Sequence, residues 1–129
     1  MDNEDLRPRT KAYALRAIRL VESLPRNRTA DVIGKQLLRS ATSVGANYRA
    51  ACRAKSPADF IAKMGIVEEE TDESLYWMEL LIESGLVAQE KLVDLMEEGN
   101  QLVAITVASI KTARTRMRNG ELGMRNQKS

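Results

Sequence analysis

Apolar residues recur every three or four positions along most of the chain, which is the spacing of one face of an α-helix. No stretch shows the strict alternation that is typical of a half-buried strand. Few prolines and glycines interrupt the pattern, and Pro25 ends the first apolar segment because the residue before a proline disfavours helix. The pattern predicts helices over residues 9–23, 29–53, 57–84 and 88–116.

Each predicted helix has a line of residues that should face a common core. The lines are Tyr13, Ala17, Leu20, Val21 and Leu24; then Ile33, Leu37, Ala41, Val44, Tyr48 and Ala51; then Phe60, Met64, Val67, Thr71, Leu75, Met78 and Ile82; and last Leu92, Leu95, Gly99, Leu102, Thr106 and Ile110. The last line repeats at close to 3.5 residues, the period of left-handed bundle packing. The short link after residue 84 requires antiparallel neighbours. We therefore expect an all-α, antiparallel up-and-down four-helix bundle, one domain over residues 1–129, with a flexible tail at 117–129.

The clearest local signals flank the third helix. Ser56 is placed to cap it, Pro57 occupies its first position, and Asp59 lies in the first turn, where the helix dipole favours an anion. Gly85 is a natural stop after the last turn.

The composition removes most catalytic chemistry. The chain has no histidine and one cysteine, so it lacks the commonest general base, a zinc ligand set and a disulfide. The acids of Glu70-Thr71-Asp72-Glu73 lack the histidine that bundle metal sites use. We therefore expect no enzyme activity, no catalytic residue, no metal and no cofactor. No apolar run is long enough for a membrane helix and no secretory signal opens the chain, which favours a cytoplasmic protein.

Charge is strongly segregated along the chain. Residues 1–56 carry a net +7, residues 57–110 a net −10, and residues 111–129 a net +5. In one interpretation the basic second helix packs beside the acidic third, within or between subunits, and the charges neutralise one another. In the other, the basic faces bind a polyanion such as RNA. The candidate nucleic-acid-binding residues are Lys35, Arg39, Arg49 and Arg53 on the second helix, and Lys111, Arg114, Arg116 and Arg118 at the end of the fourth.

The third helix has a second apolar flank outside its core line. Ile66, Trp77 and Leu80 lie there, together with Glu70 and Glu73. Such a flank often marks a subunit interface, and we predict that these five residues form one. The alternative is that a wide bundle simply covers Trp77.

The segment from Leu37 to Val87 resembles the 23S rRNA intervening-sequence protein family, also called the four-helix-bundle protein family. The motifs that carry this resemblance are Leu38-Arg39-Ser40-Ala41-Thr42-Ser43-Val44-Gly45-Ala46-Asn47, the turn Lys55-Ser56-Pro57-Ala58-Asp59-Phe60-Ile61, and the third-helix stretch from Glu69 to Leu81. Their order and spacing together are more specific than any one of them.

The resemblance implies a bundle assembled as a homopentamer. Some members of the family are encoded within insertions in ribosomal RNA genes, and a related branch comprises accessory proteins of diversity-generating retroelements that bind RNA and a reverse transcriptase. The leading hypothesis is therefore a non-enzymatic, homo-oligomeric, RNA-associated accessory protein, with RNA and a protein such as a reverse transcriptase as possible partners. The alternative is a structural or protein-binding scaffold with no nucleic-acid role.

Overall fold

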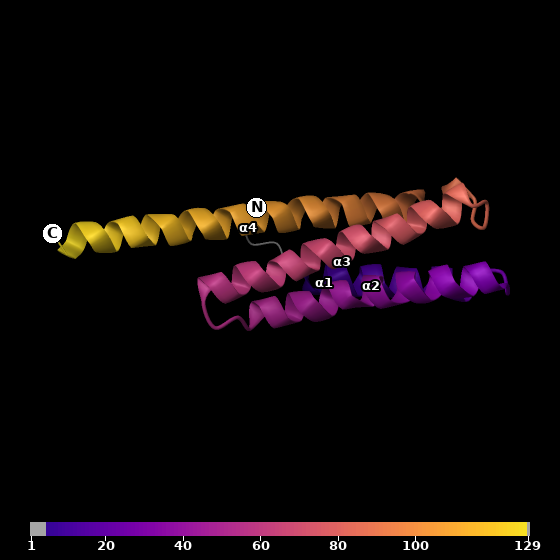
Figure 1. The fold of residues 1–129 in the computed structure, drawn as a ribbon, viewed down its shortest axis with the longest axis horizontal. Coiled ribbons are helices and arrows are strands. Elements are labelled where there is room, and N and C mark those ends of the chain that lie inside the picture. The colour runs from indigo at the N-terminus through magenta and orange to yellow at the C-terminus, as the bar shows by residue number, and fades with distance from the viewer. Residues whose placement is uncertain (1–4, 129) are drawn as a thin grey trace.

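A computed structural model describes residues 5–128 of the chain, and the side chains of residues 5–120. The described residues form long antiparallel helices, and no strand occurs among them (Figure 1). The elements are α1 (Leu6–Glu22), α2 (Arg28–Cys52), α3 (Pro57–Glu83), the short 3₁₀ helix η1 (Gln89–Lys91) and α4 (Val93–Lys128). The expected all-α four-helix bundle is confirmed.

Side-chain caps determine where the first three helices begin. The carboxylate of Asp5 accepts a hydrogen bond from the Arg7 amide, so α1 begins at Leu6, earlier than the predicted start at residue 9. Asn27 caps α2 in the same way, by accepting from the Ala30 amide. Ser56 caps α3 through the Asp59 amide, with Pro57 in the first turn, as predicted.

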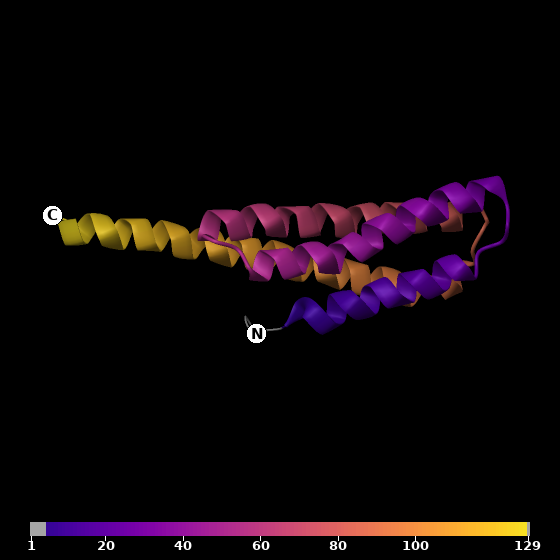
Figure 2. The same ribbon diagram turned by 90° about the horizontal axis from the view of Figure 1, so that it is seen from below.

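The fourth helix differs most from its predicted limits. Chain reversal uses Gly85, whose φ of +80° is left-handed, and a 3₁₀ turn then delays the start of α4 from residue 88 to Val93. At its other end α4 continues to Lys128, well past the expected end at residue 116 and through the predicted flexible tail. The part of α4 beyond the bundle projects from the end where α2 turns into α3 (Figure 2).

The helices do not close the bundle evenly. α2 lies against both α1 and α3, and α3 lies against α4, whereas α1 and α4 meet over a short stretch. At that stretch the Arg9 guanidinium pairs with the Glu98 carboxylate, Nη2 to Oε1, at 2.7 Å. The two side chains are 26% and 20% exposed, so this pair is better shielded from solvent than most surface pairs.

The predicted core lines are buried where they cross the middle of the bundle. All six residues of the fourth line are buried, and Leu37, Val44, Met64 and Met78 are completely or almost completely so. Residues at the ends of the lines, among them Leu24, Ile33 and Phe60, are partly buried and pack against this core. The helical periodicity therefore identified most of the core. It did not include Leu6, Leu81 and Val87, which are also buried.

A buried polar contact joins α1 and α3 in this core, beside α4. The Tyr13 hydroxyl of α1 and the Ser74 hydroxyl of α3 form a hydrogen bond of 2.6 Å, and both residues are 0% exposed. Ser74 in turn donates to the Thr71 carbonyl. Gly99 of α4 makes room for this contact, because a Cβ at that position would lie 2.8 Å from the Tyr13 hydroxyl oxygen.

We expect burial of the Tyr13 hydroxyl to make the stability of the fold depend on alkaline pH. Burial raises the pKa of Tyr13 to about 12, and the hydrogen bond with Ser74 opposes the shift in part. The folded-state pKa lies above the ordinary value. The stability that the buried, protonated Tyr13 contributes is therefore complete below about pH 10 and is lost as pH rises toward 12. Tyr13→Phe should lower the free energy of unfolding by about 1 kcal/mol at neutral pH. At alkaline pH it should avoid up to about 2–3 kcal/mol of the destabilisation that the wild type suffers.

Urea denaturation at neutral and alkaline pH measures both effects. Tyr76→Phe is the matched control, since Tyr76 is 51% exposed. An alkaline loss in Tyr13→Phe as large as that in the wild type would contradict the assignment.

Candidate nucleic-acid interface

A basic groove runs between α1 and α2 at the end of the bundle where α1 begins. Its cations are Arg7 and Lys11 on α1, and Arg49 and Arg53 on α2. Within each helix the two cations are four residues apart, so both project on one side. The groove has a volume of about 680 Å³, and no acidic residue is among the described residues that line it.

Small residues bring the two helices close and form the floor of the groove. A Cβ at Gly45 of α2 would lie 3.1 Å from the Thr10 hydroxyl oxygen of α1, so the helices nearly touch there. Thr10, Ala14, Thr42 and Ala46 also line the groove. The long cationic side chains therefore stand around a shallow floor that carries hydroxyl groups.

The electrostatics of this groove favour an anion. Arg7 pairs with Asp5 at 3.1 Å, and this contact raises the pKa of the arginine. The two side chains are 61% and 49% exposed, so solvent screens the pair strongly. Lys11, Arg49 and Arg53 are exposed and make no ion pair within the described part of the chain. Such a set can contact several phosphate oxygens at once.

Arg49 and Arg53 were predicted from sequence, whereas Arg7 and Lys11 were missed. The available signal was the i, i+4 spacing of Arg7 and Lys11, but nothing in the sequence states which helices are neighbours. Lys35 is exposed on α2 and is not among the residues that line the groove. Of the four candidates on the second helix, the structure thus brings two together.

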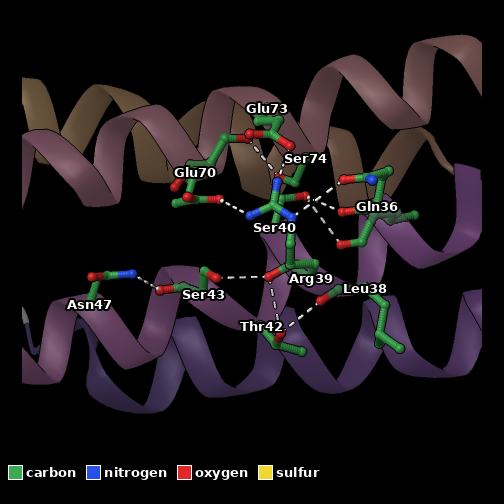
Figure 3. Close-up of polar contacts among 12 residues, drawn as sticks. Gln36, Leu38, Arg39, Ser40, Thr42, Ser43, Asn47, Glu70, Glu73 and Ser74 are labelled. Atoms are coloured by element: carbon green, nitrogen blue, oxygen red, sulfur yellow. Dashed lines mark hydrogen bonds and ion pairs between the residues drawn. The ribbon is translucent and has the colours of Figure 1, made fainter.

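Arg39, the remaining candidate on α2, lies against acids of α3 (Figure 3). Its guanidinium contacts the Glu70 carboxylate at 3.2 Å and also pairs with Glu73. Glu73 accepts a further hydrogen bond from the Trp77 indole at 3.0 Å. The hydrogen bond from the Trp77 indole lowers the pKa of Glu73 most, and the contact with Arg39 lowers it further. At this position a basic residue of the second helix is neutralised by acids of the third helix within one chain, as the first interpretation of the charge pattern expects.

This network includes three of the five residues predicted to form a subunit interface. Glu70, Glu73 and Trp77 are occupied by contacts within the chain, and Trp77 is half-buried. Ile66 is 41% exposed and Leu80 is half-buried. A subunit contact on this flank stays a prediction.

The cations of α4 are separate from the α1–α2 groove. Lys111, Arg114, Arg116 and Arg118 are all exposed. Arg116 borders a second groove of about 550 Å³, whose lining includes Leu6, Tyr48 and Phe60. This second groove is mostly apolar and lies at the same end of the bundle, beside the first residue of α1.

Polar residues of the second-helix motif serve the helix itself. Ser40, Thr42 and Ser43 donate to carbonyls three or four residues earlier in α2, as Figure 3 shows. The Asn47 amide does the same, by donating to the Ser43 carbonyl at 2.8 Å. These contacts keep the side chains close to their own helix, which explains why small polar residues suit this tightly packed strip.

Among the described residues, no group of three or more Cys, Asp or Glu side chains is placed to hold a metal ion. None of the helices is long and apolar enough to cross a membrane within this part of the chain.

The family model of the 23S rRNA-intervening sequence proteins matches residues 4–108. The chain belongs to this family. Its motifs in α2 and α3 are those on which the resemblance was based, and that identification is confirmed.

A solved structure agrees with this membership in the 23S rRNA-intervening sequence protein family. It is the 1.70 Å crystal structure of a protein of unknown function from the S23 ribosomal protein family of Bacteroides thetaiotaomicron VPI-5482. The two proteins are 34% identical, with a TM-score of 0.78, over 83% of this chain and 99% of the other. No curated protein matches the chain. Residues 109–129 lie beyond the family match.

Proposed function

We propose that the protein is a non-enzymatic, homo-oligomeric accessory protein that binds RNA through the phosphate backbone. The observation that carries this proposal is the α1–α2 groove, in which four cations from two helices surround a shallow floor, and the described residues that line it include no acid. Side chains arranged in this way fit a row of phosphates better than a single small anion, because the cations are spread along both helices.

The groove also suggests how selective this binding is. No aromatic side chain is among the described residues that line it, so it offers no platform for stacking bases. Contacts to phosphates alone position a nucleic acid without reading its sequence. We therefore expect the backbone of structured RNA to bind with little sequence preference.

Oligomerisation strengthens this mode of binding. The family resemblance implies five copies, and each copy would present one groove. Several weak contacts on one RNA then act together, since each further contact is intramolecular. A protein partner such as a reverse transcriptase could join the same assembly.

The second candidate function is a structural or protein-binding scaffold. The contact of Arg39 with Glu70 and Glu73 favours it, because charge blocks that neutralise each other need no nucleic acid. The two functions differ in one measurable property, which is whether purified protein binds RNA in a salt-dependent way.

Fluorescence anisotropy with a labelled RNA duplex tests this across a range of salt concentrations. Four phosphate contacts in a single groove predict a slope of about −3 to −4 for log affinity against log salt, hence a loss of about a hundredfold or more between 50 and 200 mM. Native mass spectrometry at low salt should show extra mass that nuclease removes. A bare oligomer that binds no duplex at low salt would exclude the proposal and favour the scaffold.

A further inference from the structure

The end of α4 lies beyond the part of the chain that the family model matches. That match ends at residue 108, whereas α4 continues to Lys128 and projects from the bundle (Figure 1). A helix without a packing partner is only marginally stable in water, and most helices gain their stability from an apolar face packed on a neighbour. The part of α4 that projects from the bundle therefore calls for a partner outside its own bundle.

The described part of this extension is a basic amphipathic helix. Ile110 is the last buried residue of the α4 core line, and Ala113 and Met117 continue that stripe at helical spacing and are half-buried. Lys111, Arg114 and Arg118 lie on one flank of that stripe, at spacings of three and four residues, and are exposed. The helix thus offers a narrow apolar stripe beside a row of cations.

A groove of opposite charge lies at the other end of the bundle, between the end of α3 and the start of α4. Its apolar lining includes Ile82, Val93 and Met96, and Val93 is 47% exposed. Glu79, Glu83 and Glu97 border it, and no lysine or arginine is among the described residues that line it. The groove has a volume of about 500 Å³.

We propose that the α4 extension of one copy docks into this acidic groove of a second copy. The three cations beside the stripe match three carboxylates beside an apolar floor, so both charge and apolar surface are complementary. Within one copy the extension and the groove lie at opposite ends of α4, so the contact cannot form intramolecularly (Figure 1). The contact joins different surfaces of two copies, head to tail, and repeats along a ring or filament.

Charge reversal on each side tests this contact without truncating the protein. In sedimentation velocity at about 50 mM salt, the triple variant Lys111→Glu, Arg114→Glu and Arg118→Glu should have an association constant at least about tenfold lower than the wild type. The groove variant Glu79→Lys, Glu83→Lys and Glu97→Lys should lose association to the same degree. Combining all six changes, or mixing the two triple variants, should restore it, because opposite charges then face each other again.

A matched control reverses three exposed cations elsewhere, Arg19→Glu, Arg28→Glu and Lys35→Glu, and should associate like the wild type. A wild-type mass for either triple variant at low salt would overturn the proposal. The proposal would also be overturned if the variant with all six changes kept its helical circular dichroism but did not regain association. A tail variant that keeps its mass but loses RNA binding would instead assign the extension to nucleic acid.

Discussion

Replacing all four cations of the α1–α2 groove by glutamine is expected to weaken RNA binding by about a hundredfold or more. The changes are Arg7→Gln, Lys11→Gln, Arg49→Gln and Arg53→Gln. Each removes one phosphate contact, and each should lower the salt slope by about one unit. Glutamine keeps much of the side-chain length and the helix propensity, so the bundle itself should be unaffected.

The matched control for this variant carries the same change in net charge at the far end of the same two helices. Its changes are Arg19→Gln, Arg26→Gln, Arg28→Gln and Lys35→Gln, all at exposed positions outside the groove. Anisotropy with one RNA duplex compares the two variants with the wild type. Equal losses in both would mean that net charge, and not this groove, attracts the RNA.

Two glycine substitutions within long helices are expected to change stability in opposite directions. Gly99→Ala places a Cβ 2.8 Å from both the Tyr13 hydroxyl oxygen and the Leu75 Cδ2 atom, and the tyrosine is held by Ser74. The crowding should lower the free energy of unfolding by about 2–3 kcal/mol, and the higher helix propensity of alanine should restore about 1 kcal/mol of this. The net result should be a loss of about 1–2 kcal/mol.

Gly65→Ala in α3 is the matched control for Gly99→Ala. A Cβ at Gly65 meets no heavy atom within 4 Å, so the full gain in helix propensity of about 1 kcal/mol should appear. The two variants should therefore differ by about 2–3 kcal/mol in their free energies of unfolding, measured by urea denaturation. Stabilisation by Gly99→Ala as large as by Gly65→Ala would disprove close packing between α1, α3 and α4.

The helices and the core could be predicted from sequence because they depend on local regularities. Apolar spacing identified all six buried residues of the fourth core line, and Ser56 with Pro57 located the start of α3 to the residue. The start of α1 was missed because its cap, Asp5, precedes Arg7 and Pro8, which carry no apolar periodicity. The end of α4 was missed because its polar, glycine-containing sequence was taken to favour a tail.

By itself, the sequence determined that this chain forms an antiparallel four-helix bundle, which residues fill most of its core, and that charge is segregated along it. These properties follow from the period of the helix, from capping and from composition, all of which act between near neighbours in the chain. Only the tertiary structure decided which cations lie together. Arg49 and Arg53 gain Arg7 and Lys11 across the α1–α2 contact, while Arg39 turns to Glu70 and Glu73 on α3. The reason is that each helix of a bundle has two flanks, and the packing of its neighbours determines whether a charge on a flank meets an opposite charge or solvent.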